Sequence, residues 1–403
     1  MCTLRGPTLS AVHFPTWRKT TSVTGVGALL LAFISSCALP ATVGAFEHAT
    51  PEMPSIRAIQ QIAMVNSDFG YGLFELASGS TCASWLGRTT NKGLTFARLV
   101  HIQSWTCGST FTEEITADGK GDVFVYGNGL FVSHDFGTRW SRTPMAGDIE
   151  EVAAVSNSVW LTDETCRSAA AISCPLRVEI SDNGGHTWAP DHSQPEGLRA
   201  LNSPTTILTT TIVRSSSQVA YVFAGPPTQH RAYKELPMWV TTDSGRSWRK
   251  RELRCGQGPF FGPVVSASRD GVLLSICAGQ PYTGYQEKST SVSRNGGRTW
   301  VVGAPCGMSS PFVDGYVGSV SALSSAVAFE AGEGAGLNMT RNDGAHWAAV
   351  RNIGDPGGGP EQVTFVNSQQ GFVLGAAAPS GAVEIWHTHD GGLHWTGVIP
   401  HVR

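Results

Sequence analysis

The stretch Ser293-Arg-Asn-Gly-Gly-Arg-Thr-Trp300 decides the fold, because it is one of seven copies of a single octet in this chain of 403 residues. Every copy follows the pattern (Ser/Thr)-x-(Asp/Asn)-x-Gly-x-x-(Trp/Phe), and consecutive copies lie 44 to 60 residues apart. A repeat of this period indicates supersecondary units that stack on one another. The residues at the third position of the seven octets are Asn91, Asp135, Asn183, Asp243, Asn295, Asn342 and Asp390.

Each octet has the chemistry of a tight hairpin turn. The side-chain oxygen of the Asp or Asn can accept hydrogen bonds from backbone N–H groups that follow it. The glycine at the fifth position permits the positive φ that such a turn needs, and the closing aromatic residue can pack back beneath the turn. We therefore expect a hairpin at every octet.

The segments between octets supply the other strands. In the last unit, residues 362–366, 371–375 and 383–387 are short apolar or alternating runs separated by Asn-Ser and Pro-Ser-Gly turn signals. Four strands in each of seven units predict one all-β domain over residues 54–403, a seven-bladed β-propeller of four-stranded antiparallel blades.

The octets resemble the Asp-box, or bacterial neuraminidase repeat, which implies that each one joins the third and fourth strands of a blade. The phrase Phe365-Val-Asn-Ser-Gln-Gln-Gly-Phe-Val373, followed by Thr388-His-Asp-Gly-Gly392, resembles the photosystem II assembly and stability factors. It also resembles exported proteins of the WD/YVTN/neuraminidase-repeat-like kind. Fold resemblance of this type implies blades and does not assign a task.

The composition excludes partners that bind by long-range charge. The chain has 28 Lys and Arg residues against 31 Asp and Glu residues, and its formal net charge is -3. Such a balance creates no field that attracts nucleic acid or an anionic membrane surface. We therefore expect a partner to be recognised locally, and a membrane to be reached only through an N-terminal lipid or anchor.

Residues 1–46 have the pattern of an export signal, because positive charge precedes a short apolar run over residues 25–34. Two cleavage sites compete. Ile34-Ser-Ser-Cys37 fits a lipobox, which would make Cys37 a lipidated N-terminus, and Val43-Gly-Ala45 fits an ordinary signal-peptidase site. An uncleaved anchor helix is a third possibility. We expect an extracellular, periplasmic or envelope-lipoprotein location, with residues 47–53 as a short linker.

The sequence nominates no catalytic residue and no cofactor. A sialidase would need an Arg-Ile-Pro motif near the first strand, where this chain has Ser55-Ile-Arg57-Ala-Ile59, and no carboxylate pair can be named for another glycosidase mechanism. The octet acids Asp135, Asp243 and Asp390 are interpreted as turn residues, since the octet position that they occupy recurs in every unit.

Metal binding is the second chemical alternative. His387, His389, His394 and Asp390 lie close together in the sequence, yet His389, Asp390 and His394 are simply positions of the seventh octet. The sequence therefore predicts no metal site.

A binding surface is expected on the face opposite the octets, where length variation gathers. Three neighbouring units have insertions between their second and third strands, at residues 164–174, 225–235 and 278–287. Aromatic and cationic side chains are typical of interaction surfaces, although ordinary loop decoration would also explain them. The candidate binding residues in these insertions are His230, Arg231, Tyr233, Lys234, Tyr282 and Tyr285.

Seven of the nine cysteines follow residue 46, which fits disulfides in an oxidising compartment. The blade plan predicts pairs between Cys82 and Cys107, Cys166 and Cys174, and Cys277 and Cys306. Cys255 is left free, and its pairing with Cys277 in place of Cys306 is the alternative, because connectivity is not decided by sequence alone.

Together these features predict an exported, non-catalytic binding or scaffold propeller that recognises a protein, a peptide or an envelope glycan on its loop-rich face. A sialidase-like glycoside hydrolase and a photosystem assembly factor-like protein are the alternatives. The oligomeric state and the ligand stay open at this point.

Overall fold

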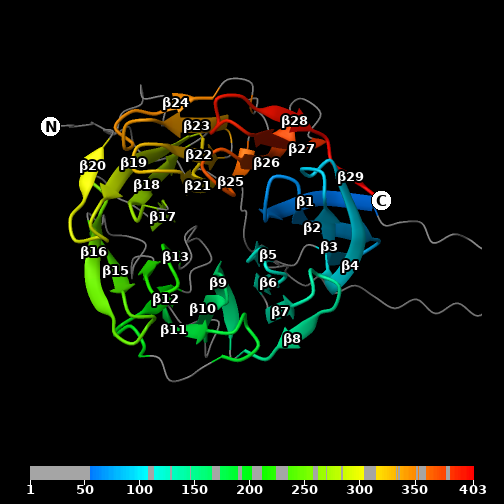
Figure 1. The fold of residues 1–403 in the computed structure, drawn as a ribbon, viewed down its shortest axis with the longest axis horizontal. Coiled ribbons are helices and arrows are strands. Elements are labelled where there is room, and N and C mark those ends of the chain that lie inside the picture. Colours follow the sequence, from blue (N-terminus) through cyan, green and yellow to red (C-terminus); the bar gives the residue numbers. More distant parts are fainter. Residues whose placement is uncertain are drawn as a thin grey trace, which may run out of the picture.

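The strands are arranged around a common centre in the computed structural model of the chain (Figure 1). The structure describes residues 55–107, 113–127, 129–145, 147–165, 173–188, 193–201, 211–223, 235–256, 262–268, 270–282, 285–303, 315–332, 334, 336–350, 353, 360–377 and 382–403. These residues form strands and turns and contain no helix. The fold is a seven-bladed β-propeller.

Each blade is a four-stranded antiparallel sheet. The strands of blades 1 to 4 are β1 (Ser55–Met64), β2 (Gly70–Ser78), β3 (Thr81–Thr89) and β4 (Thr95–Thr106); β5 (Glu114–Ala117), β6 (Val123–Gly127), β7 (Gly129–Ser133) and β8 (Ser141–Thr143); β9 (Asp148–Val155), β10 (Ser158–Glu164), β11 (Ser173–Ser181) and β12 (Arg199–Leu201); and β13 (Thr211–Arg214), β14 (Ala220–Phe223), β15 (Glu235–Thr241) and β16 (Arg249–Arg254). Those of blades 5 to 7 are β17 (Gly262–Ala267), β18 (Leu273–Tyr282), β19 (Tyr285–Ser293) and β20 (Val301–Gly303); β21 (Ser319–Ala322), β22 (Ala328–Gly332), β23 (Gly336–Thr340) and β24 (Ala348–Ala349); and β25 (Pro360–Phe365), β26 (Gly371–Ala377), β27 (Ala382–Thr388) and β28 (Thr396–Val398).

The end of the chain closes the ring. Strand β29 (His401–Val402) adds to the outer strand β4 of blade 1 in parallel orientation. The N–H of His401 donates to the carbonyl of Leu94 at 2.9 Å, and the N–H of Arg403 donates to that of Phe96 at 2.8 Å. Blade 7 is thereby tied to the outer edge of blade 1, and Figure 1 shows both ends of the described chain at this place.

All seven octets form the same turn. In each, the hydroxyl oxygen of the first residue accepts the N–H of the glycine at the fifth position, at 2.7 to 3.0 Å. The carboxylate or amide oxygen of the third residue accepts the N–H of the seventh, also at 2.7 to 3.0 Å. The polar side chains of the octet therefore bind the backbone of their own turn.

The turn needs left-handed backbone at two consecutive positions. The glycine at the fifth position has positive φ, as expected, and the residue before it has a φ of 59° to 72° in every octet. Only three of these fourth positions are glycine; the other four are Lys92, Phe136, Ser244 and Asp343. A non-glycine residue pays a conformational penalty here, which the packing of the blades must offset.

The hydrophobic core consists of seven clusters, one between each pair of neighbouring blades. The closing aromatic residue of each octet joins the cluster that its blade shares with the preceding blade. Phe96 of blade 1, for example, packs with Phe372 and Ile385 of blade 7. The expected packing of this aromatic beneath its turn is therefore packing between blades.

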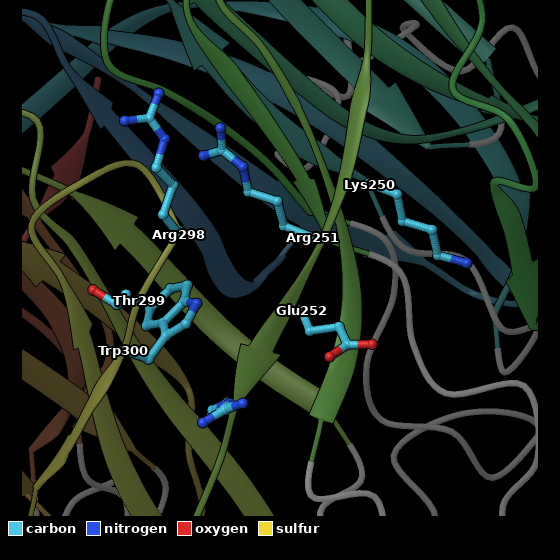
Figure 2. Close-up of a pocket in the computed structure, with 8 residues that line it drawn as sticks. Lys250, Arg251, Glu252, Arg298, Thr299 and Trp300 are labelled. Carbon is cyan, nitrogen blue, oxygen red and sulfur yellow. The ribbon is translucent and has the colours of Figure 1, made fainter.

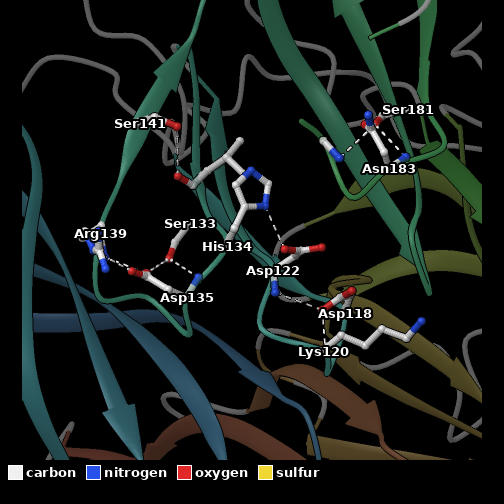
Figure 3. A network of polar contacts seen from close by, with 12 residues as sticks. Asp118, Lys120, Asp122, Ser133, His134, Asp135, Arg139, Ser141, Ser181 and Asn183 are labelled. Carbon is white, nitrogen blue, oxygen red and sulfur yellow. Dashed lines mark hydrogen bonds and ion pairs between the residues drawn. The ribbon is translucent and has the colours of Figure 1, made fainter. Parts of the chain in front are cut away.

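A polar contact within blade 2 positions a histidine ring that stacks on blade 3 (Figure 3). Nδ1 of His134, in the second octet, lies 2.8 Å from Oδ1 of Asp122. The His134 ring stacks on that of His186, from the third octet, with 3.6 Å between ring centroids. In the same view Asp135 accepts a bond from Ser133 and pairs with Arg139 of its own octet. The stacked rings therefore bring the second and third octet turns against each other.

The predicted pair Cys82 and Cys107 forms a disulfide within blade 1. The predicted bond between Cys277 and Cys306 is wrong, because Cys277 is bonded to Cys255. The Cys255 carbonyl accepts a hydrogen bond from Ser289, which is the strand partner of Cys277, so the exit of blade 4 is held beside blade 5. Cys174 is disulfide-bonded, while its predicted partner Cys166 and also Cys306 lie outside the described residues.

One predicted insertion has a more regular structure than a loop. Residues 278–282 and 285–287 continue β18 and β19 as paired strands, with Tyr282 opposite Tyr285. Among the residues that the structure describes, no helix has the length and apolar character needed to cross a bilayer.

Candidate ligand-binding groove

A groove of about 670 Å³ lies on the rim of the propeller, between the outer strand of blade 4 and the octet turn of blade 5 (Figure 2). Strand β16 forms one side of the groove, and the octet that follows β19 forms the other. The residues that line it are Lys250, Arg251, Glu252, Arg254, Gly297, Arg298, Thr299 and Trp300.

The alternation of β16 divides its side chains between two directions. Arg251 and Leu253 are opposite Met238 and Leu236, and Leu253 is buried in the cluster shared with blade 5. Arg251 therefore points toward blade 5, where its guanidinium donates to the carbonyl of Gly296 in the fifth octet. Neighbouring residues along β16 point the other way.

Positive charge dominates the groove. Figure 2 shows the Arg251 and Arg298 side chains extending in the same direction from the two walls. Burial lowers the pKa of Arg251, and the positive charge of Arg298 lowers it further. On the other side of β16, Lys250 lies over the Trp239 ring, and Arg254 pairs with Glu235 at 3.2 Å. Two arginines that extend side by side from the two walls of a groove offer a site to a carboxylate or another anion.

An apolar edge continues from this cationic groove. Trp300 is half-buried against the core cluster of blades 4 and 5. The next two residues, Val301 and Val302, have exposed fractions of 68% and 44% on the outer strand of blade 5. A ligand in the groove would therefore meet arginine side chains and, beside them, an apolar strip.

The sequence contains one signal for this groove, a dense run of cations. Residues 249–254 read Arg-Lys-Arg-Glu-Leu-Arg, with four cations in six residues. Arg298 belongs to the next repeat, and nothing in the spacing of the two segments shows that Arg251 and Arg298 line one groove.

The predicted binding residues on the opposite face are not tested by the structure. His230, Arg231, Tyr233 and Lys234 lie outside the described residues. Tyr282 and Tyr285 have described backbone in β18 and β19, but their side chains lie outside the described part. Cys37 precedes the first described residue, and the side chain of Arg57 in β1 is likewise outside.

The carboxylates of Asp135, Asp243 and Asp390 are hydrogen-bonded within their own octet turns. A hydrogen bond from the Ser247 hydroxyl is the main cause that lowers the pKa of Asp243 to about 2. Backbone N–H donors at Arg139 and His394 are the main causes that lower the pKa of Asp135 and Asp390. These three carboxylates are anions at neutral pH, and each accepts hydrogen bonds from N–H groups of its own turn.

The histidines of the seventh blade do not converge. His394 contacts Asp390 through Nδ1 at 2.7 Å, which is a contact within one octet. Within the described ranges, no group of three or more His, Cys, Asp or Glu side chains has the arrangement to hold a metal ion.

Two carboxyl groups that the sequence did not predict to be close together meet at one tyrosine. The Tyr126 hydroxyl lies 3.1 Å from Oε2 of Glu114 and 3.2 Å from Oε1 of Glu151. Glu114 is on β5 and Glu151 on β9, which are the first strands of blades 2 and 3. Burial raises the pKa of Glu151, and the Glu114 charge raises it further. A neutral carboxyl at this place keeps two like charges from meeting at the interface.

A second buried carboxyl group, that of Glu113, is expected to make the stability of the fold depend on pH. Burial raises the pKa of Glu113 from 4.5 to about 7, although Gln103 donates a hydrogen bond to it. A carboxyl with a higher pKa in the folded state favours folding at low pH, and this contribution is lost as the pH rises from 4.5 through 7. We expect Glu113→Gln to raise the free energy of unfolding by about 1–3 kcal/mol near pH 8, with little change near pH 4.

Urea unfolding at the two pH values measures this effect, with the exposed Glu252→Gln as the matched control. Equal changes for Glu113→Gln at both pH values would contradict the assigned cause.

The sequence matches no protein-family model and no curated protein. Among solved structures, YCF48 bound to a D1 peptide is similar with a TM-score of 0.50 and 14% identity, over 81% of this chain and 91% of that one. The GH74 xyloglucanase of Xanthomonas campestris has a TM-score of 0.51 and 15% identity, over 84% of this chain and 60% of that one. A Trypanosoma rangeli sialidase has a TM-score of 0.37 and 11% identity.

The first two likenesses show the fold. The chain is similar to the propellers of an assembly factor and of one glycoside hydrolase, and at such low identity the similarity assigns neither of their tasks to it.

Proposed function

We propose that this chain is an exported binding propeller whose rim groove takes an acidic segment of a partner protein. The observation that carries the proposal is the position of Arg251 and Arg298 on the two walls of the groove, beside Trp300 and the exposed valines. Arginine and tryptophan are enriched among the residues that dominate binding energy at protein interfaces. A propeller of similar fold has been solved with a peptide bound, which supports a peptide as the kind of ligand.

The charge arrangement supports an acidic partner. Arg251 and Arg298 bring two cations to the side of the groove that faces blade 5. The other charged residues in its lining, Lys250, Glu252 and Arg254, point to the other side of β16, where Arg254 pairs with Glu235. The whole chain is slightly acidic, so this concentration of positive charge is local. Local complementarity of this type governs the rate and specificity of association.

The test uses a fluorescein-labelled peptide that alternates threonine and glutamate, with fluorescence anisotropy as the readout. We expect the double variant Arg251→Glu/Arg298→Glu to bind at least about tenfold more weakly. The matched control is Arg142→Glu, a charge reversal on the outer strand β8 of blade 2, which should bind like the unmodified chain. Equal affinity for all three proteins, or no binding by any, would refute an acidic ligand in the groove.

The loop-rich face is a second proposed surface, because its insertions carry Tyr233, Tyr282 and Arg231. Tyr233→Ala in the same assay separates the two surfaces. A loss with Tyr233→Ala and none with the groove variant would move the partner to the loop-rich face.

Export is supported by the two disulfides, since such bonds persist in oxidising compartments. Mass spectrometry of the mature protein should find a lipid-modified Cys37 or an N-terminus near Phe46. An intact Met1 in the cytoplasmic fraction would refute export.

A glycoside hydrolase is the alternative, and one observation favours it, the meeting of Glu114 and Glu151 at Tyr126. Hydrolases of that class need two carboxyl groups at the scissile bond. Turnover of aryl glycosides that is lost in Glu151→Gln, without a loss of folding, would establish the alternative over a binding role.

A further inference from the structure

Strand β16 is a regular sheet edge on which no other described strand lies. The outer strands of blades 2, 3, 5, 6 and 7 have two or three residues, whereas β16 has six. The longer β4 is covered at its start by β29, and two register shifts interrupt its pairing with β3. The pairing of β16 with β15 has no register shift, and no strand of the described part lies beyond it.

An edge of this kind has backbone groups that can pair with another strand. In an antiparallel pair, alternate residues of the outer strand direct their N–H and C=O groups away from the sheet. Proteins usually protect such edges by short strands, bulges or charges. The outer strands of the other blades are short or have register shifts, whereas β16 is protected by its charges.

The charges on β16 select what can pair with it. Arg249, Lys250, Arg251 and Arg254 outnumber Glu252 on the strand itself. A second copy of the same basic edge would be repelled, because like charges on directly opposed strands are destabilising. An acidic strand would instead place carboxylates opposite these cations.

The molecule already contains one strand added in this way. Strand β29 is held on the edge of β4 by backbone bonds from His401 and Arg403, with two residues in register. An outer edge of this propeller is therefore able to accept an extended segment. Binding of a peptide as an extra strand is also a recurrent mode of peptide recognition.

We propose that an extended acidic segment of a partner protein adds to β16 as a fifth strand of blade 4. This inference rests on the proposed function and specifies its binding mode. Side chains alternate along a strand, so every second residue of the segment would face Arg251, Arg298 and Trp300. The ligand class is an extended segment with an acidic residue at alternate positions.

The experiment repeats the anisotropy assay with two further peptides of the same alternating threonine and glutamate sequence. One is N-methylated at the threonines and the other at the glutamates, which removes one of the two alternating sets of N–H donors and leaves the side chains in place. Only one set of N–H groups can face β16. We expect methylation of that set to weaken binding at least about tenfold, and methylation of the other set to change it less than about twofold.

The outcomes separate the two proposals. Equal binding of all three peptides would show that side-chain charges hold the ligand, which would overturn strand addition and leave the acidic groove in place. Equal weakening by both methylated peptides would also overturn addition to one edge. Failure of the unmethylated peptide to bind would refute both proposals, the acidic ligand and its addition to β16 as a strand.

Discussion

Replacing Lys288 by methionine is expected to lower the free energy of unfolding by about 3–5 kcal/mol. Lys288 is on β19 of blade 5, and its Nζ lies 3.0 Å from Oε1 of Glu330 on β22 of blade 6. Both side chains have an exposed fraction of 0%, and the other Glu330 oxygen accepts a 2.9 Å bond from Asn338. The variant leaves the Glu330 carboxylate buried without its cation, and the desolvation of that charge costs far more free energy than the hydrogen bond from Asn338 contributes.

Urea unfolding followed by tryptophan fluorescence measures this loss. The double variant Lys288→Met/Glu330→Gln is the control, because a neutral amide can keep the bond to Asn338 without an unpaired charge. We expect it to recover at least about half of the loss. If Lys288→Met alone stayed within about 1 kcal/mol of the unmodified chain, the pair would not be holding blades 5 and 6 in the assigned way.

Replacing Gly392 by alanine is the second large expected loss, of about 2–4 kcal/mol. Gly392 is the fifth residue of the seventh octet, with a φ of 82°. A Cβ at this position would overlap Cζ of Phe329, which is fully buried in the core of blade 6. The alanine therefore combines backbone strain with a clash against a ring that has no free space to move into.

Gly79→Ala separates these two causes. Gly79 also has positive φ, at 59°, but a Cβ there would meet no atom within 4 Å. We expect this control to lose about 1 kcal/mol, from strain alone. Equal losses for Gly79→Ala and Gly392→Ala, measured by the same urea unfolding, would show that the contact between blades 6 and 7 is not tight.

The octets predicted the number of blades because all the residues that make the turn are neighbours in the chain. The bonds from Ser133 and Asp135, for example, close on backbone groups at most four residues away. Short apolar runs between octets likewise predicted the strands of the last blade, which the structure places at β25, β26 and β27. Local turn chemistry and alternation are properties of consecutive residues, so the sequence by itself determined the propeller and its repeat.

Contacts between blades were decided by the tertiary structure. Arg298 meets Arg251 only because the octet of one blade packs against the outer strand of the preceding blade. Cys277 pairs with Cys255 for the same reason, since Ser289 holds the carbonyl of Cys255 beside it. The carboxyl groups at Tyr126 come from two different blades.

These partners lie some 20 to 50 residues apart in the chain, with a separation of 22 for the Cys255–Cys277 disulfide. At such distances no local rule ranks one partner above another, since the entropy of closing the loop changes little with its length. Packing of one blade on the next selects the partner. The sequence by itself therefore determined which turns and strands form, and only the tertiary structure decided which side chains share a groove.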